Sequence, residues 1–282
     1  MKNVFKAFRA ICGIVYTILH VVFVTTPGFL VEGIYCAVVS LGDGAAFRNR
    51  FTWHTLGHGA LLFRILCMIL GIKARFHLPK VDISRMSGPF IGIANHQSLI
   101  DTLLLCVASW LVKQTRARWV LKRGVWWVFP VAFAAWVTKC AFVKRTGKGS
   151  GDLEAVIECA SQAHLDNANF LFFPEGGRFK GAPLGAKFQF VTEPRIGGWK
   201  KALGAMPTAD VLVFLIRWGG AKAGQPFGRT LWEGAFAFVN NTLDVTIEYV
   251  PRAVVDADPQ WLQNRWQTME EDLAQTAFAE AA

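Results

Sequence analysis

The chain of 282 residues lacks several patterns that mark common classes of protein. Its six cysteines form no C-x-x-C pair, which argues against a zinc ribbon or a dithiol redox site. No run of lysine and arginine is interleaved with aromatic residues, which weakens nucleic acid as the explanation for a basic chain. Repeats and low-complexity tracts are absent too. We therefore expect an ordinary folded protein without a nucleic-acid partner.

Acidic residues are also few, 20 against 30 lysines and arginines, so the formal net charge is +10. Such a charge suits anionic head groups or a substrate that carries phosphate. The hydrophobic share of 53% and the mean hydropathy of +0.33 exceed what is usual for a soluble domain. Eleven tryptophans add side chains that are favoured at a bilayer interface. Part of the chain should therefore contact lipid.

The cysteines are widely spaced and mostly have apolar neighbours. We interpret them as buried, reduced thiols, which favours a body that faces the cytoplasm. They are Cys12, Cys36, Cys67, Cys106, Cys140 and Cys159.

A basic leader precedes an apolar stretch from Ile11 to Leu41, in which Glu32 is the only formal charge. Thr25–Gly28 interrupts this stretch, so two hydrophobic helices joined by a break fit best. Each half has about 14 residues, fewer than the ~20 that cross a bilayer, so a re-entrant or interface-buried hairpin competes with one long tilted span. The leader places the amino terminus in the cytoplasm. A cleaved signal peptide is the minority alternative, because no convincing cleavage site follows.

A second segment that could contact the membrane runs from Ala60 to Ile72 and is too short to span it. Just before it, His54 and His58 have the spacing of zinc ligands on a helix. Thr55 stands where a metalloprotease has glutamate, and no third ligand is evident. We therefore expect two interface histidines and no metal.

From about Gly88 the pattern changes to short apolar runs separated by helical lengths, which predicts an α/β fold. The expected strands are 90–94, 118–121, 170–173, 211–216 and 243–250, and the expected helices are 100–113, 131–138, 152–163 and 259–279. We divide the chain into a membrane-binding helical region, 1–75, and an undivided α/β domain, 76–282. Catalytic loops should leave the carboxyl ends of the strands.

The segment Asn95–Asp101 follows the first of these strands and holds His96 and Asp101 five residues apart. With His96 in a turn and Asp101 in the first turn of a helix, the carboxylate would orient the imidazole, whose other nitrogen could take a proton from a substrate hydroxyl. Helix capping by Ser98-x-x-Asp101 is the structural alternative, but it leaves His96 unexplained. No G-x-S-x-G surrounds Ser98, so we expect that serine to be structural.

The segment Phe172–Arg178 repeats this logic, because an apolar strand runs into a Pro-Glu-Gly-Gly turn. Its glycines would let backbone amides approach a ligand, and Arg178 could grip a phosphate with two hydrogen bonds. A plain turn with a surface ion pair is the alternative. Two upstream apolar stretches also end in paired cations, at Lys122-Arg123 and Lys144-Arg145, which are usually solvated ends unless they converge on one pocket.

Five blocks taken in order resemble the 1-acylglycerol-3-phosphate acyltransferase family, the glycerolipid acyltransferases with an N-H-x4-D motif. The resemblance spans about Phe90 to Leu203, and a tail with Trp261-Leu262-x-x-x-Trp266 also looks like some members. The blocks are Asn95–Asp101, Val120–Arg123, Ala141–Arg145, Phe173–Arg178 and Glu193–Gly198. The resemblance implies an α/β domain with a mixed central sheet flanked by helices, preceded by a hydrophobic helical hairpin.

Position by position, the resemblance implies that His96 is the general base and Asp101 its orienting carboxylate. Lys122, Arg145 and Arg178 would hold the acceptor's phosphate. The remaining implied residues are Glu175, Gly176 and Gly177 in the acceptor-site loop and Pro194, Arg195, Gly197 and Gly198 along the acyl or acceptor channel. The family usually has threonine in place of Gly177, which leaves the acceptor's head group open.

The predicted function is transfer of a fatty acyl group from acyl-ACP or acyl-CoA to the sn-2 hydroxyl of 1-acylglycerol-3-phosphate, giving phosphatidate. A thioester is already activated, so no cofactor and no metal are expected. The expected partners are membrane lipids, the lysophospholipid acceptor and the acyl carrier, and the expected location is the inner membrane with the catalytic domain in the cytoplasm. The alternatives are another lysophospholipid or an amino-acid lipid as acceptor, a thioester hydrolase, and a non-catalytic lipid-binding membrane protein.

Overall fold

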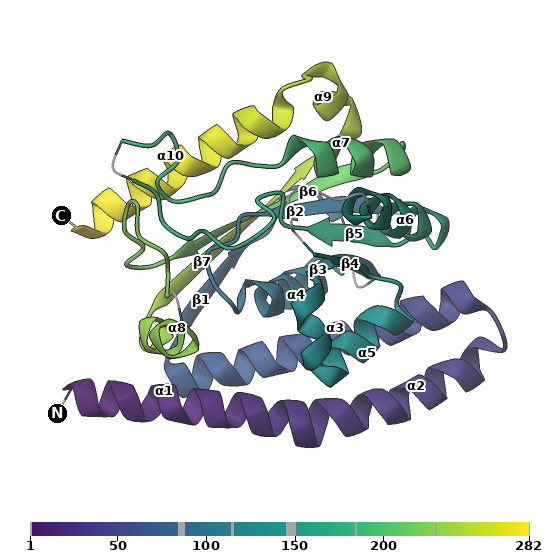
Figure 1. The fold of residues 1–282 in the computed structure, drawn as a ribbon, viewed down its shortest axis with the longest axis horizontal. Helices are drawn as coiled ribbons and strands as arrows, with labels where there is room; N and C mark the ends of the chain where they lie inside the picture. The colour runs from purple at the N-terminus through teal and green to yellow at the C-terminus, as the bar shows by residue number, and fades with distance from the viewer. Residues whose placement is uncertain are drawn as a thin grey trace.

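The computed structural model describes residues 2–83, 88–113, 116–144, 151–183, 185–228 and 230–281. Within these segments seven strands form one mixed sheet of order β1-β7-β6-β2-β5-β3-β4 (Figure 1). Neighbouring strands are parallel except for the antiparallel pair β6 and β7. The strands are β1 (Lys73–His77), β2 (Phe90–Ala94), β3 (Ala117–Lys122), β4 (Ala141–Val143), β5 (Asn169–Phe172), β6 (Asp210–Trp218) and β7 (Thr242–Val250).

Helices cover both faces of the sheet (Figure 1). One buried cluster joins the sheet to α3, α4 and α8, and the other joins it to α6, α7 and α10. The helical elements are α1 (Lys2–Leu19), the π-helix η1 (His20–Thr25), α2 (Thr26–Ser40), α3 (Gly44–Leu70), α4 (Asp101–Leu111), the 3-10 helix η3 (Arg123–Trp127), α5 (Phe129–Val137), α6 (Asp152–Leu165), α7 (Ile196–Ala205), α8 (Leu231–Phe238), α9 (Arg252–Ala257) and α10 (Trp261–Ala281).

Strand β2 lies at the centre and is buried along its whole length. Its side chains alternate between the two clusters, with Phe90 and Ala94 on one face and Ile91 and Ile93 on the other. A Cβ on Gly92 would come within 2.0 Å of a Leu171 methyl on β5, so only glycine lets these strands pack this closely. The loop that carries the site thus leaves a central strand that is buried on both faces.

The expected strands and helices of the body are all present, with boundaries shifted by a few residues. Two strands were not expected: β1, a half-exposed strand at the sheet edge, and β4, which has only three residues. Strand β1 also straddles the expected boundary at residue 75, because Lys73–His77 pairs with β7.

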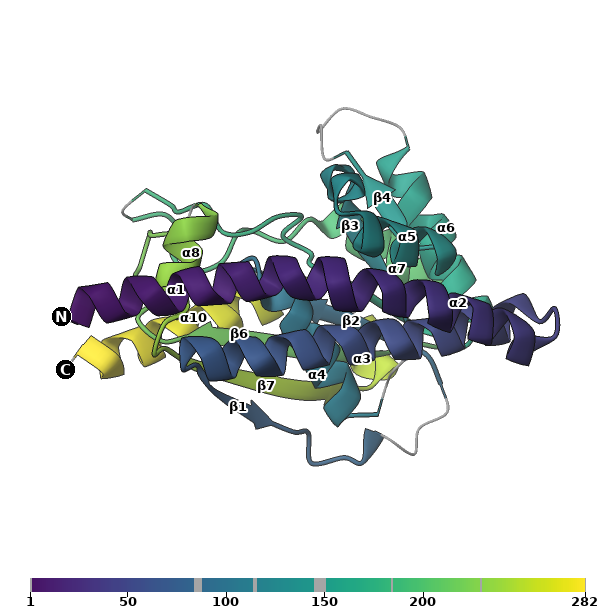
Figure 2. The ribbon, with the colours of Figure 1, turned by 90° about the horizontal axis from the view of Figure 1, so that it is seen from below.

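The amino-terminal region is a pair of long antiparallel helices, but the turn is not where the sequence suggested (Figure 2). The expected break at Thr25–Gly28 is wrong, because helical structure continues through it from residue 2 to Ser40. The π-helix η1 precedes Pro27, and Thr26 donates to the carbonyl of Val21 from its backbone and its hydroxyl. This wider turn accommodates the proline, which lacks an N–H group, without ending the helix.

The actual turn lies at Leu41–Asp43, where Leu41 has a φ of 46° and the Asp43 carboxylate caps α3 by accepting from Ala45 N and Ala46 N. Helix α3 therefore contains the expected short segment Ala60–Ile72 almost entirely. By length and composition both Asn3–Ser40 and Gly44–Leu70 could cross a membrane. Only 17% and 28% of their most apolar windows are buried within the protein, so their apolar surface faces outward.

A buried ionic cluster fastens the helix pair to the sheet. Asp166 accepts hydrogen bonds from Arg48 on α3, at 2.6 Å from both Nε and Nη2, and from Arg118 Nη2 on β3 at 2.8 Å. Burial alone would raise the pKa of Asp166, but the two arginines outweigh it and hold that pKa below its ordinary value. Arg118 has no exposed side-chain surface, so its charge depends on Asp166 for compensation.

We expect Asp166→Asn to lower the free energy of unfolding by about 3–5 kcal/mol, because it leaves the buried Arg118 charge without a counter-ion. Asp256→Asn removes a half-exposed partner from the pair Arg252–Asp256 and should cost less than about 1 kcal/mol. Denaturant unfolding in detergent measures both variants. Equal losses would show that the cluster does not hold the helix pair to the sheet.

Candidate active site

The site begins where β2 ends. Asn95 is fully buried, and its amide pairs with the backbone of Ile216 on β6, donating from Nδ2 to the carbonyl at 2.9 Å and accepting from the N–H at 2.7 Å. A side chain thus prolongs the pairing of β2 with β6 by one residue after the strand has ended. These two hydrogen bonds fix the position of the residue that precedes His96.

Asp101 is the first residue of α4 and has no exposed surface. Its Oδ2 lies 3.1 Å from His96 Nδ1 and accepts from the backbone N–H groups of Gln97 and Ser98 at 2.8 and 2.7 Å. Its Oδ1 accepts from the Ser98 hydroxyl and, at 3.0 Å, from Trp218 Nε1. The carboxylate therefore does both things that the sequence suggested, since it ties the turn to the helix start and contacts the histidine.

Of the two side chains that donate to Asp101 Oδ1, one is close to it in the sequence and the other is distant. The Ser98 hydroxyl donates its hydrogen bond to the Asp101 carboxylate, which agrees with a structural role for this serine. Trp218 sits at the end of β6, 117 residues from Asp101 along the chain, and no local pattern indicated it. Only the strand order, which places β6 beside β2, could have pointed to it.

The imidazole of His96 is stacked on the ring of Phe173, with centroids 4.0 Å apart and planes 15° apart. Its side chain keeps 12% of its surface exposed. With Nδ1 facing Asp101, the opposite nitrogen, Nε2, hydrogen-bonds none of the described residues. Phe173 and Asp101 thus fix the ring and leave one nitrogen available to a substrate.

Glu175, in the loop after β5, holds the backbone of this turn. Its Oε1 accepts from His96 N at 2.9 Å and its Oε2 from Thr192 N at 3.0 Å. Only 2% of the residue is exposed, and this burial raises the pKa of Glu175 to about 8, with a smaller contribution from the nearby Asp101 charge. The glutamate expected in the acceptor-site loop therefore contacts the backbone of the histidine.

The rest of this loop is fixed at both ends. Gly176 has a φ of +70°, and a Cβ there would come within 2.8 Å of Arg195 Nε, so the position requires glycine. Beyond Gly177 and Arg178, Phe179 N donates to the carbonyl of His96 at 2.8 Å. The loop that carries Arg178 is thus bonded to the histidine turn, and the Arg178 side chain is half-buried.

The expected cations are brought together only in part. Because β2, β5 and β3 are adjacent and parallel, their carboxyl ends meet at one edge of the sheet, where His96 and Arg178 follow β2 and β5 and Lys122 ends β3. Lys122 is exposed at the end of β3. Arg145 lies outside the described residues.

The four residues expected along a channel surround the start of α7. Arg195 N donates to the carbonyl of Pro174 at 2.8 Å, which brings this helix end against the loop of Glu175. Pro194 is buried, and Gly197 and Gly198 lie in the first turn of the helix. None of the four lines the apolar cavity described next.

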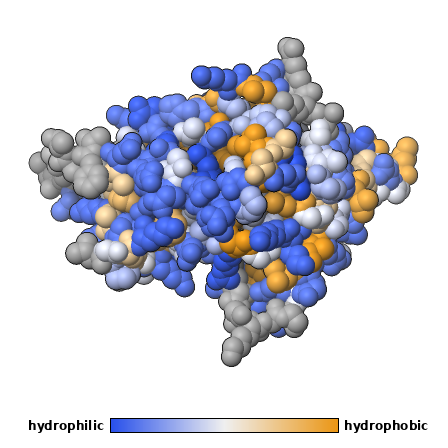
Figure 3. Space-filling model, turned by 90° about the horizontal axis from the view of Figure 1, so that it is seen from above, coloured by the Kyte–Doolittle hydropathy of each residue, from blue (hydrophilic) through white to orange (hydrophobic). Residues whose placement is uncertain are grey.

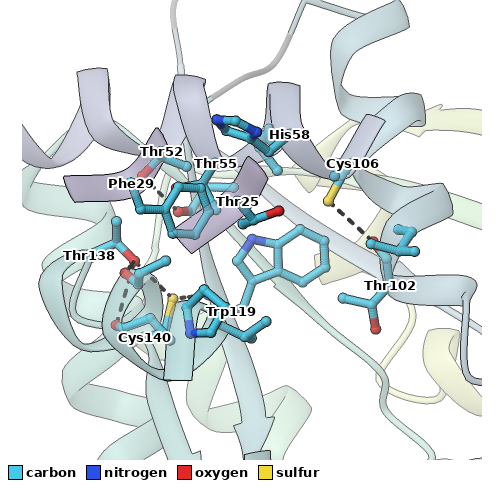
Figure 4. A pocket seen from close by; sticks show the side chains of 18 of the residues that line it. Thr25, Phe29, Thr52, Thr55, His58, Thr102, Cys106, Trp119, Thr138 and Cys140 are labelled. Carbon is cyan, nitrogen blue, oxygen red and sulfur yellow. Dashed lines mark hydrogen bonds between the residues drawn. The ribbon is translucent and has the colours of Figure 1, made fainter. Parts of the chain in front are cut away.

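An apolar cavity of about 150 Å³ lies between the helix pair and the sheet (Figure 4). Its walls come from η1, α2, α3, α4, α5 and β3, with Trp119 across its centre. Three threonines in the wall donate their hydroxyl hydrogens to backbone carbonyls four residues earlier, so they add little polarity to the cavity. Thr102, which directly follows Asp101, and Leu121, which precedes Lys122, also line it. The cavity thus adjoins both the site turn and the cationic strand end along the chain.

The described residues contain no group of three or more His, Cys, Asp or Glu side chains that could hold a metal ion. His54 and His58 instead share Glu32 Oε1, at 3.3 and 3.1 Å. The six cysteines all lie in described segments and are free. The expectation that all are buried is wrong for three of them, because Cys12, Cys67 and Cys140 are only partly buried.

Comparison with known proteins adds two findings. The family model described as Acyltransferase matches residues 75–215, half of the chain. The fold is similar to the crystal structure of PlsC, the 1-acyl-sn-glycerophosphate (LPA) acyltransferase from Thermotoga maritima, with a TM-score of 0.61, 17% identity, and coverage of 100% of this chain and 98% of that one. No curated protein sequence matches.

We expect the raised pKa of Glu175 to make stability fall as the pH rises. Between the ordinary glutamate value of 4.5 and about 8, the unfolded chain has lost this proton while the folded one keeps it, so the free energy of unfolding declines by about 1.4 kcal/mol per pH unit from this group. Glu175→Gln should remove that component of the slope between pH 5 and 7. The exposed Glu193→Gln is the control, and equal slopes in both variants would contradict the assignment.

Proposed function

Because this chain belongs to the acyltransferase family, we propose that it transfers a fatty acyl group from acyl-ACP or acyl-CoA to the sn-2 hydroxyl of 1-acylglycerol-3-phosphate, giving phosphatidate. The observation that carries the proposal is the pair His96–Asp101, held in a rigid turn with one imidazole nitrogen open. The similar fold of a protein named as an acyltransferase for this acceptor supports the choice of substrate.

In the proposed reaction, His96 Nε2 takes the proton of the acceptor hydroxyl as its oxygen attacks the thioester carbonyl. Asp101 stabilises the imidazolium that forms, through the contact at Nδ1. The tetrahedral intermediate then expels the thiolate, and the imidazolium returns the proton to that sulfur. One C–O bond forms, one C–S bond breaks, and no covalent enzyme intermediate is needed.

The cationic edge would hold the acceptor. Arg178 and Lys122 follow neighbouring parallel strands, and we propose that they bind the phosphate, with Arg145 as a third group. Glu175 and Gly176 would shape the acceptor loop. Gly177 provides no hydroxyl there, which favours another lysophospholipid or an amino-acid lipid as the second candidate acceptor. A thioester hydrolase is a weaker proposal, because water needs no cationic pocket.

The apolar cavity would hold the hydrocarbon of an acyl chain. Its lining is almost wholly apolar, and its walls include Thr102, next in sequence to Asp101. A chain seated there would lie between the helix pair and the sheet, where it is shielded from water.

The helix pair would bind the protein to the inner membrane, with the catalytic domain in the cytoplasm. Large apolar side chains are exposed along it, among them Phe23, Val31 and Ile34, each about 70% exposed. The face opposite the pair is mostly hydrophilic (Figure 3). A second apolar region lies at η3 and the start of α5, where Trp127 is 93% exposed and Trp126 49%. The exposed cations Lys122 and Arg123 lie at the start of this region, and they suit an anionic lipid surface.

Replacement of the proposed base should abolish transfer. We expect His96→Ala to lose at least ~100-fold in the rate of phosphatidate formation from palmitoyl thioester and 1-acylglycerol-3-phosphate in mixed micelles, because general base catalysis is lost. His77→Ala, an exposed edge histidine, is the control. Retained turnover in His96→Ala would remove the assignment. If the wild-type protein acylates a different lysolipid only, the mechanism stands and the acceptor changes.

The tryptophans of η3 should matter only at a bilayer. We expect Trp126→Ser/Trp127→Ser to lower activity toward an acceptor in vesicles with anionic lipid about tenfold, a loss of about 1.4 kcal/mol in membrane interaction. Activity toward a short-chain acceptor in solution should stay unchanged. Val254→Ser, on α9 across the sheet from the helix pair, is the matched control (Figure 1). Equal activity of both variants on vesicles would exclude this contact.

A further inference from the structure

Glu270 lies on α10, outside the segment that the family model matches, and only 7% of it is exposed. Its carboxylate accepts from three consecutive backbone N–H groups of the loop before α7. Gln189 N donates to Oε1 at 2.6 Å, Phe190 N to Oε2 at 3.0 Å, and Val191 N to Oε2 at 3.2 Å. A buried carboxylate held by three amides is a strong, directional anchor for a segment that forms neither helix nor strand.

The next residue of that segment reaches the site. Thr192 N donates to Glu175 Oε2 at 3.0 Å, and the other oxygen of Glu175 accepts from His96 N at 2.9 Å. Gln97 adds a longer contact, from Nε2 to the carbonyl of Phe190 at 3.4 Å. Two carboxylates and one short stretch of backbone therefore connect the C-terminal helix to the turn of the histidine.

The chemistry of this connection requires an acceptor at position 270. Every bond to Glu270 comes from an N–H group, so an amide in its place would turn its own NH2 toward at least one donor. The freed amides are buried or half-buried, and the segment would shift to satisfy them. Since Glu175 takes Thr192 N from the same segment, a shift there reaches the backbone of His96.

We propose that Glu270 is a positioning residue for acyl transfer, which sets residues 189–192 and, through Glu175, the backbone of His96. The inference rests on the proposed function and names a residue far from the site in sequence. A purely structural role, in which Glu270 only attaches α10, makes a different prediction. It predicts a loss of stability with unchanged turnover of the folded protein.

The test compares Glu270→Gln with Glu271→Gln, the adjacent residue, whose contact is with Gln267 on the same helix. At a temperature where both variants are folded, Glu270→Gln should reduce kcat roughly 10- to 100-fold, because small misplacements of a catalytic group have effects of that size. The KM for the thioester should change less than about twofold, since Glu270 is buried and its carboxylate is occupied by backbone N–H groups of residues 189–191. Unchanged kcat in Glu270→Gln would overturn the inference.

A double-variant cycle tests the route. If Glu270 acts through Glu175, adding Glu270→Gln to Glu175→Gln should lower kcat much less than it does in the wild-type background. Full additivity would mean that Glu270 acts by another route and would refute the proposal.

Amide hydrogen exchange gives a readout that needs no activity. In Glu270→Gln, but not in Glu271→Gln, exchange should accelerate in peptides covering 189–192 and also in those covering 95–98. Acceleration confined to 189–192 would refute the coupling to His96. Should the wild-type protein transfer acyl groups to no acceptor, the proposed function fails, while the exchange experiment still decides whether Glu270 positions the histidine turn.

Discussion

The rest of the site depends on one buried carboxylate, that of Asp101. It receives the histidine, two successive backbone amides, a hydroxyl and an indole, and it does so with no contact with solvent. Burying a carboxylate away from water costs free energy unless donors satisfy its lone pairs, so the carboxylate depends on all of these donors together. The turn after β2 is consequently held in one conformation before any substrate arrives, and that preorganisation is what a general base needs.

Three further buried carboxylates extend the same principle through the molecule. Asp166 joins the helix pair to β3, Glu175 joins the two site loops, and Glu270 joins a loop to α10. Asp166 accepts from two arginine side chains, whereas Glu175 and Glu270 accept from backbone N–H groups of irregular segments, which no helix or strand pairs. A basic protein with few acidic residues thus places four of them in its interior, where one carboxyl group accepts hydrogen bonds from several donors.

Local pattern was sufficient for much of this architecture. Short apolar runs predicted five of the seven strands, and the spacing of His96 and Asp101 predicted their contact, because both depend on neighbouring residues. Trp218 and Glu270 could not be found in this way, since each meets the site only through the order of strands or the packing of α10. The break expected at Pro27 failed for a different reason, because a wider helical turn can accommodate a proline that a regular α-helix cannot. The roles of Arg178, Lys122 and the residues around Pro194 stay predictions, since they concern ligands.

The π-helical turn η1 also determines which side of the long amino-terminal helix faces the protein before and after it. Ala10 in α1 and Phe29 in α2 are both buried, and they lie 19 residues apart. At about 100° per residue, a regular helix would place them about 100° apart around its axis. The π-helix accommodates one extra residue without added rotation, so the remaining 18 residues make about five full turns. Both side chains therefore lie on the same side of the helix. A helix of 39 residues can therefore keep one continuous seam toward the protein and one continuous strip of exposed apolar side chains, because η1 corrects the drift midway.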